Sequence, residues 1–171
     1  MRFVITGEWT RNRLLMAIII LFSVYIAMLW LTNLLLYFHK MGLTYQSVVE
    51  YYLGSEEIFL QPKSYQGLLE ISHFHLFAMG ILLLTLTHLM LFVPLRPELK
   101  AWLIAVPFFS ALADEGGGWL VRFVHPMFAY VKISGFLLLE GSLAVLIMVS
   151  LWAVFAGSQG TYNGNAGRDQ K

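Results

Sequence analysis

Long apolar segments alternate with short polar ones along this sequence. Apolar runs occupy residues 14–38, 68–95, 101–124 and 128–156. A helix needs about 20 residues to cross the hydrocarbon core of a bilayer, and each run meets that length. The first run is too long for the core of a signal peptide and lacks a small-residue cleavage site, so we expect it to be retained. The pattern predicts an all-α protein, a four-helix transmembrane bundle whose membrane domain spans residues 14–156.

The polar segments predict how this bundle is oriented. The lead at residues 1–13, the turn at 96–100 and the tail at 157–171 hold seven Lys or Arg, against four on the opposite side. Because cytoplasmic loops are enriched in these cations, we expect both termini in the cytoplasm and the long loop 39–67 outside it. This arrangement is typical of a multi-pass protein of a cell inner membrane. The tail is polar and rich in Gly and Asn, which predicts disorder.

The long loop carries apolar side chains at helical spacing: Val48, Val49, Tyr52 and Leu53. These positions predict a short helix that lies on the membrane surface. We expect Gly54 to end this helix and Pro62 to break any further helix in the loop, so that the loop forms a structured cap over the bundle.

Two of the apolar runs contain residues that disturb or link helices. The third run includes Pro107 and three consecutive glycines at 116–118, which predict a kink and a loosened or broken helix. Irregular backbone at that depth survives only when it is buried in protein or lines a cavity. In the first run, Asn33 predicts a hydrogen bond to a neighbouring helix.

Composition restricts the classes of function. The chain is 58% apolar and 12% charged, whereas ordinary soluble domains have about 25% charged residues. A net charge of +1 argues against a nucleic-acid partner, which requires a basic surface, and leaves the lipid bilayer as the expected environment. With no cysteine, the chain itself holds no disulfide, iron–sulfur cluster, c-type haem or zinc–thiolate site.

Residues 70–95 place three of the five histidines inside one apolar run. Ionisable groups in such a run are costly and usually face a protein interior or a cofactor. His73 and His88 are fifteen positions apart, which puts them roughly 60° apart around a helix and about 22 Å along it. Gly80 lies between them on nearly the same side. His75 points the other way, roughly 200° from His73.

Two histidines at opposite depths of one helix, with a glycine between them, resemble the haem-bearing helices of b-type cytochromes. In that class such histidines hold two stacked haems, and glycines let the macrocycle lie against the backbone. The resemblance covers this one helix, and no other segment has a matching histidine pair. It implies haem b as the cofactor.

On the expected topology, several polar groups meet at one end of the bundle. His73 or His75 and His125 are the candidate axial ligands of the iron of one b-type haem, and Arg122 is the candidate partner of a propionate. The alternative is that these histidines hydrogen-bond to backbone, Trp or Tyr groups near the membrane interface. His88 lies deeper. It would ligate a second haem together with Met16 or Met148, or it is an ordinary core residue.

Three carboxylates lie deep in the last two runs. Asp114 and Glu140 are candidates for a proton path beside a quinone site. Glu115 and Arg122 lie seven positions apart and predict an ion pair. A copper or zinc site built from His73 or His75 with Asp114 or Glu115 is a further alternative, although no diagnostic spacing supports it.

These features predict an electron-transfer protein. In this hypothesis a b-type cytochrome subunit links the quinone pool to an extracytoplasmic redox partner, and the redox subunits it needs are supplied by other chains. Two alternatives stay open. One is a cofactor-free structural or assembly subunit of a larger membrane complex. The other is a carrier of metal ions or protons, which requires Asp114 and Glu140 to line one continuous polar path.

Overall fold

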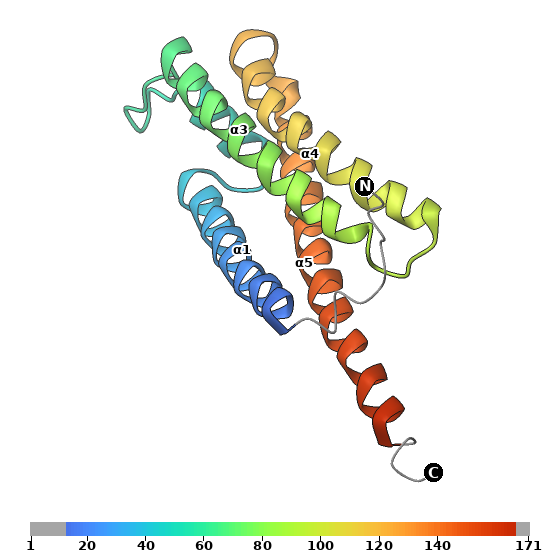
Figure 1. Cartoon of the computed structure of the whole chain (residues 1–171). Coiled ribbons are helices and arrows are strands. Elements are labelled where there is room, and N and C mark those ends of the chain that lie inside the picture. Colours follow the sequence, from blue (N-terminus) through green and yellow to red (C-terminus); the bar gives the residue numbers. More distant parts are fainter. Residues whose placement is uncertain (1–12, 167–171) are drawn as a thin grey trace.

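The computed structural model describes residues 13–166, which fold almost entirely into helices (Figure 1). Within this range the chain forms five α-helices and one short 3-10 helix, and its β-structure is a single isolated bridge between Ser55 and Leu60. In chain order the elements are α1 Arg13–Lys40, α2 Tyr45–Leu53, α3 Tyr65–Met90, α4 Pro97–Phe123, η2 Pro126–Phe128 and α5 Ala129–Ala166.

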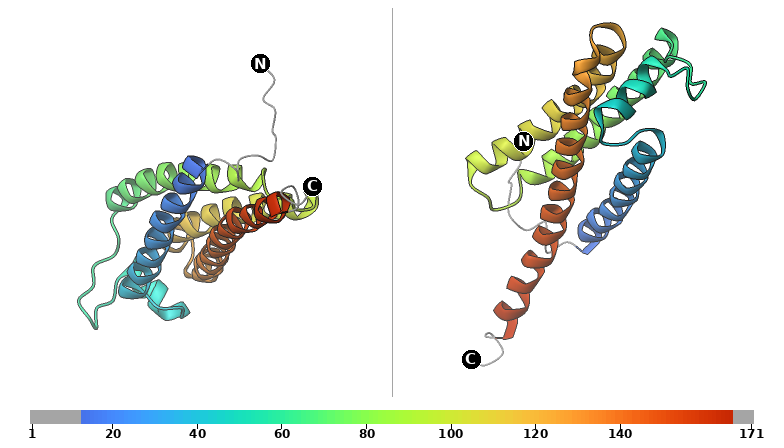
Figure 2. Two further views of the ribbon diagram at one scale, coloured as in Figure 1. Left: turned by 60° about the horizontal axis from the view of Figure 1, so that its bottom comes forward. Right: turned by 180° about the vertical axis from the view of Figure 1, so that it is seen from behind.

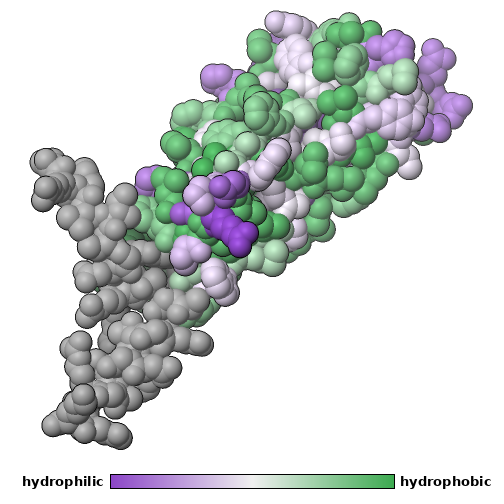
Figure 3. All heavy atoms as spheres, turned by 90° about the vertical axis from the view of Figure 1, so that its right-hand side faces the viewer, coloured by the Kyte–Doolittle hydropathy of each residue, from purple (hydrophilic) through white to green (hydrophobic). Residues whose placement is uncertain are grey.

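Three of the described segments are long and apolar enough to cross a membrane: Leu14–Lys40, Tyr65–Met90 and Pro126–Ala153. Many Leu, Ile and Phe side chains are exposed on them, and apolar side chains cover much of the face shown in Figure 3. Water penalises such a surface, whereas lipid tails do not. The prediction of an all-α transmembrane protein is therefore confirmed. The third predicted span, 101–124, corresponds to α4, which is not among these three segments.

The helices pack around α5. The antiparallel pair of α4 and α5 is the most extensive contact, α3 packs on both of them, and α1 packs mainly on α5 (Figures 1 and 2). The short helix α2 contacts α4 and α5 at one end of the bundle, which we call the cap end.

The short helix predicted in the long loop is present as α2. The Thr44 side chain accepts a hydrogen bond from the Ser47 amide at its start, and Gly54 ends it with a φ of 84°, a conformation that suits glycine. That this helix lies on the membrane surface stays a prediction, and the structure shows that one of its faces packs on the bundle. Val48 and Tyr52 are buried against the bundle, and burial raises the pKa of the Tyr52 phenol far above its ordinary value.

The turn between α3 and α4 begins earlier than the hydropathy predicts. The second apolar run extends to residue 95, but α3 ends at Met90. The next residues form tight turns in which the Leu91 and Phe92 amides donate to the carbonyls of His88 and Leu89. Pro97 then opens α4 at its first position, where a missing amide hydrogen costs nothing. The apolar run is therefore longer than the helix, because part of it forms the turn.

The prediction that the glycines at 116–118 break the helix is wrong, because α4 is helical from Pro97 to Phe123. These glycines allow close packing instead. A Cβ atom at Gly117 would lie 2.8 Å from the Lys132 Cα atom, and one at Gly118 would lie 2.6 Å from the Tyr52 hydroxyl. Reciprocally, a Cβ atom at Gly135 on α5 would lie 2.5 Å from the Asp114 amide nitrogen. Side chains at these positions would push the helices apart.

The last helix extends past its expected end. The hydropathy predicts that the fourth span ends at residue 156 and that a disordered tail begins at 157, but α5 remains helical to Ala166. A helix gains one hydrogen bond for each residue it adds once it is nucleated, so it can continue past the apolar segment. The rest of the predicted tail, 167–171, and most of the basic lead lie outside the described residues.

Two apolar clusters form the core. The deeper cluster joins α1, α3 and α5 and includes Leu83, Leu86 and Leu146. The cluster at the cap end joins all five α-helices, and in it the ring of Tyr37 stacks on Phe136 with their centroids 3.5 Å apart. Most of the polar side chains that contact one another across the helices lie where these clusters meet.

Replacing Gly117 or Gly135 by alanine should destabilise the protein by about 1–3 kcal/mol, the usual range for overpacking a well-packed interface. The added Cβ atom meets backbone in both cases and has no flexible neighbour to displace. The free energy of unfolding, measured by denaturant titration in micelles, checks this. Gly141→Ala is the matched control, because a Cβ atom there meets nothing within 4 Å. Equal stability of all three variants would contradict the packing role.

Candidate functional site

A buried ion pair joins α4 to α5. Lys132 Nζ lies 2.7 Å from Asp114 Oδ1, and only 9% of the lysine side chain is exposed. Each charged residue faces a glycine of the other helix, Asp114 facing Gly135 and Lys132 facing Gly117. The close approach of the two backbones lets these side chains meet. A lone charge in a membrane is costly, so the pairing stabilises both helices in this register.

Glu115, the next residue on α4, is held from the side of α3. The Ser72 hydroxyl donates a short hydrogen bond to one Glu115 oxygen and accepts one of 2.7 Å from the Trp119 indole. His75 Nδ1 lies 3.2 Å from the other Glu115 oxygen. Ser72 and His75 come from successive turns of α3, so both reach the same carboxylate. The His75 side chain is half exposed, whereas Glu115 is largely covered.

Glu140 on α5 is held from the side of α1. The Asn33 amide donates to Glu140 Oε1 at 2.6 Å, and the Trp30 indole donates to the Glu140 backbone carbonyl at 3.0 Å. The hydrogen bond predicted from Asn33 to a neighbouring helix is thus confirmed. Glu140 is only 5% exposed, and its second oxygen, Oε2, has no hydrogen-bond partner among the described residues.

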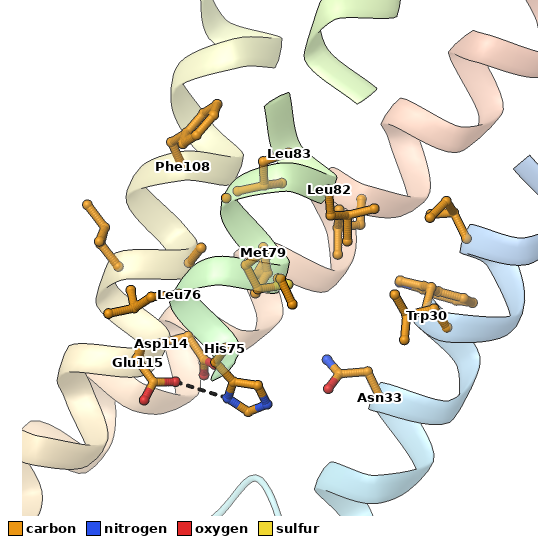
Figure 4. Close-up of a pocket in the computed structure, with 18 residues that line it drawn as sticks. Trp30, Asn33, His75, Leu76, Met79, Leu82, Leu83, Phe108, Asp114 and Glu115 are labelled. Carbon is orange, nitrogen blue, oxygen red and sulfur yellow. Dashed lines mark hydrogen bonds and ion pairs between the residues drawn. The ribbon is translucent and has the colours of Figure 1, made fainter. Parts of the chain in front are cut away.

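A cavity of about 240 Å³ lies between these two groups (Figure 4). Its residues come from α1, α3, α4 and α5, and α3 passes between the α4 side and the α1 side in the close-up. The end toward the cap is polar and the deeper end is apolar. The polar end is lined by Asn33, His75, Asp114 and Glu115, and the deeper end by Ile26, Leu82, Leu83, Phe108 and Leu143.

The charges around the polar end do not balance while His75 is neutral. Asp114 and Glu115 are both acidic, and Lys132 is the one permanently charged cation that contacts either of them in the described structure. Lys132 lies against Asp114, which leaves Glu115 with His75 as its partner. His75 and Glu115 therefore form an acid–base pair at the polar end of the cavity.

The structure does not bring the predicted haem ligands together. His75 and Glu115 are in contact, and Ser72 binds the same carboxylate, so His73 lies at this level too. From Glu115 to the end of α4 at Phe123 the helix rises about 12 Å. His125 lies beyond that end, where its Nδ1 accepts a hydrogen bond from the Met127 amide. The histidines predicted to share one iron are therefore at different depths here.

The other predicted haem residues have no part in the cavity, apart from Gly80, which lines it. The exposed ring of His88 meets the edge of Phe92. Arg122 Nε donates to the Lys63 carbonyl at 2.7 Å, so it anchors the loop before α3. Among the described residues no group of three His, Cys, Asp or Glu side chains is placed to hold a metal ion.

The predicted ion pair between Glu115 and Arg122 is wrong. The helical wheel puts the two residues on one side of α4, but seven positions separate them by about 10.5 Å along the axis. Glu115 contacts α3, and Arg122 contacts the loop that precedes it.

Sequence reasoning misses several polar partners of these acidic residues, above all Lys132. A lysine a few residues inside an apolar helix needs a partner, but the charge count uses Lys132 only as one of the four cations opposite the cytoplasmic side. Ser72, Trp119 and Trp30 gave no comparable signal. Small hydroxyl and aromatic side chains are common in membrane helices, and only packing shows which carboxylate they approach.

Lys132→Ala should destabilise the protein by about 3–5 kcal/mol, because it leaves Asp114 buried without its cation. Asp114→Ala should destabilise the protein by a similar amount, because it leaves Lys132 buried without its anion. The double variant should lose clearly less than the sum of the two, because no unpaired charge remains. Denaturant titration in micelles measures all four proteins of this cycle. Strict additivity would show that the pair contributes no coupling.

One comparison with known proteins gives a match. The family model Aq_1264_TM, described as a transmembrane helical domain, matches residues 42–161, which run from the loop before α2 through most of α5. No curated protein and no solved structure matches the chain. Trp30 and Asn33 on α1 precede the matched residues, whereas His75, Asp114, Glu115, Lys132 and Glu140 all lie within them. The chain belongs to the Aq_1264_TM family of transmembrane helical domains.

Proposed function

We propose that this chain is an integral membrane electron-transfer subunit that binds the head group of a quinone in the cavity between α1, α3, α4 and α5. In this proposal α4 crosses the membrane beside the three apolar helices, which makes a four-helix transmembrane bundle in a cell inner membrane. Both termini are cytoplasmic, and the cap end faces the other side, where a redox partner subunit docks.

One observation carries this proposal: the polar end of the cavity has two hydrogen-bonding groups, each backed by a carboxylate. His75 is backed by Glu115 on one side (Figure 4). Asn33 is backed by Glu140 on the other. A quinone ring has two carbonyl oxygens on opposite edges, and each needs a donor when it is buried. The apolar remainder of the cavity suits the rest of a lipid-soluble molecule.

The size of the cavity favours a single ring over a macrocycle. Its volume of about 240 Å³ is below the roughly 300–1,000 Å³ of most ligand pockets. His75 lines this cavity, whereas His125 is not among its lining residues and lies at another level of the bundle. A quinone head group therefore fits better than a haem in the space the four helices enclose.

Quinol oxidation releases two protons and two electrons, and the proposal assigns a destination to each. His75, supported by Glu115, accepts one proton. The other passes to Glu140, whose Oε2 atom is buried without a partner among the described residues. The electrons pass one at a time to a redox centre of a partner subunit, such as a haem or an iron–sulfur cluster. Reduction of a quinone uses the same groups in reverse.

Binding of a quinone separates this proposal from a cofactor-free structural subunit. Quinones quench nearby tryptophan fluorescence, and Trp30 lines the cavity. Addition of a short-chain quinone to the purified protein should quench part of the tryptophan fluorescence, and the quenching should saturate. The Trp30→Phe variant should lack this quenchable part of the fluorescence. His75→Ala should weaken binding at least about tenfold, the equivalent of one lost charge-assisted hydrogen bond.

His73→Ala is the matched comparison for that variant. It removes an imidazole two positions away whose ring meets only the edge of Phe74 in the described structure. We expect its affinity for the quinone to differ less than about twofold from that of the unchanged protein. This is a smaller change in binding free energy than the loss of one hydrogen bond would cause. Equal losses in His73→Ala and His75→Ala would contradict the site, and the absence of saturable quenching would favour the structural subunit.

Visible spectroscopy tests the separate hypothesis that the chain holds haem b. The arrangement of the histidines leads us to expect quinone binding without a stoichiometric b-type signal in the reduced-minus-oxidised spectrum of the purified chain. Pyridine haemochrome quantitation gives the haem content. A signal near one haem per chain that disappears in His125→Ala would establish the His73/His75–His125 site instead, and a second haem would assign His88.

A further inference from the structure

The cavity is longer than a quinone ring, and its lining changes from polar to apolar along its length. On α3 the lining residues run from His75 to Leu83, about 12 Å of helix. The polar side chains are confined to the end near His75. Gly80, five positions or about 7.5 Å deeper, lies in the apolar part. A head group bound between His75 and Asn33 would leave the deeper part unfilled.

Gly80 keeps that deeper part open. A Cβ atom at Gly80 would meet no atom within 4 Å, in contrast to Gly117 and Gly135, where it would meet backbone. On α3, Gly80 follows Leu76 by one turn and precedes Leu83 by one turn, so these positions share one face and all three line the cavity. The glycine here borders free space, and it is not needed for close helix packing.

The cavity also has apolar edges that face outward. Leu29 on α1, Leu76 on α3 and Leu112 on α4 line it and are each about half exposed. α1 packs mainly on α5, so the sides of α1 and α3 that border the cavity are not sealed by contact between them. In a membrane, these edges adjoin lipid tails. A ligand can therefore enter sideways from the bilayer while part of it stays in the lipid.

We infer that the quinone of this site carries a long isoprenoid tail, which lies beside Gly80 in the apolar part of the cavity and leaves between the helices into the bilayer. This inference rests on the proposed quinone site and adds the class of substrate. A tail-less or water-soluble quinone would fill only the polar end and would leave Gly80 beside an unused space.

The experiment compares two ligands on three proteins. The ligands are a tetramethylbenzoquinone and the analogue in which an isoprenoid chain of several units replaces one methyl group. The proteins are the unchanged chain, Gly80→Phe, and Gly141→Phe as the matched control. Gly141 also has no atom within 4 Å of an added Cβ atom, but it does not line the cavity. Quenching of the Trp30 emission gives each affinity.

Gly80→Phe should weaken binding of the tailed quinone at least about tenfold and change binding of the tail-less ring less than about twofold, since the phenyl ring fills only the deeper space. Gly141→Phe should change neither. Circular dichroism and thermal unfolding check that the variants fold, and Gly80→Leu replaces Gly80→Phe if the phenylalanine is not tolerated.

Other outcomes separate the two proposals. Unchanged affinity of Gly80→Phe for the tailed quinone would overturn the tail assignment and leave the deeper space to a lipid acyl chain. Equal weakening of both ligands would also overturn it, because the ring itself would then lie beside Gly80. Failure of both ligands to quench the unchanged protein would instead overturn the quinone site.

Discussion

The contact between Lys132 and Asp114 is the constraint on which the rest of the arrangement depends. A buried charge is costly without a partner, and these two meet because Gly117 and Gly135 let the backbones of α4 and α5 approach closely. The pair therefore fixes how far one helix can slide along the other. Once α4 and α5 are in this register, Glu115 is turned toward α3 and Glu140 toward α1.

Those two carboxylates then decide where the remaining long helices lie. Lipid tails are as apolar as leucine, so the hydrophobic effect gives membrane helices little reason to prefer one neighbour over another. Polar contacts supply that preference here, with Ser72 and His75 binding Glu115 from α3 and Asn33 binding Glu140 from α1. Three of these groups, Asn33, His75 and Glu115, also line the cavity. Removing one for a functional test consequently has a structural cost, which is why matched variants are needed.

The sequence predicts the helices of this protein better than their contacts. Hydropathy located α1, α3 and α5, and the Gly54 signal located the end of α2, because these depend on local composition. The role of the glycines at 116–118 depends on which backbone lies opposite, and a single sequence does not show that. The Glu115–Arg122 pairing failed because a helical wheel gives direction around the axis and ignores distance along it. The alternative that places His73 or His75 beside Asp114 or Glu115 names the right pair among four, but only the fold shows that His75 and Glu115 are the two that meet.

α1 has a distinct place in this molecule. It packs mainly on α5, it supplies Trp30 and Asn33 to the cavity, and it lies before the residues that match the family. The charged pair and Glu115 with its partners are all on α3, α4 and α5. The cavity thus has three walls built from the family domain and a fourth added by a separate segment. A change in α1 can therefore alter the wall of the cavity that carries Trp30 and Asn33, while the contacts that join α3, α4 and α5 stay the same.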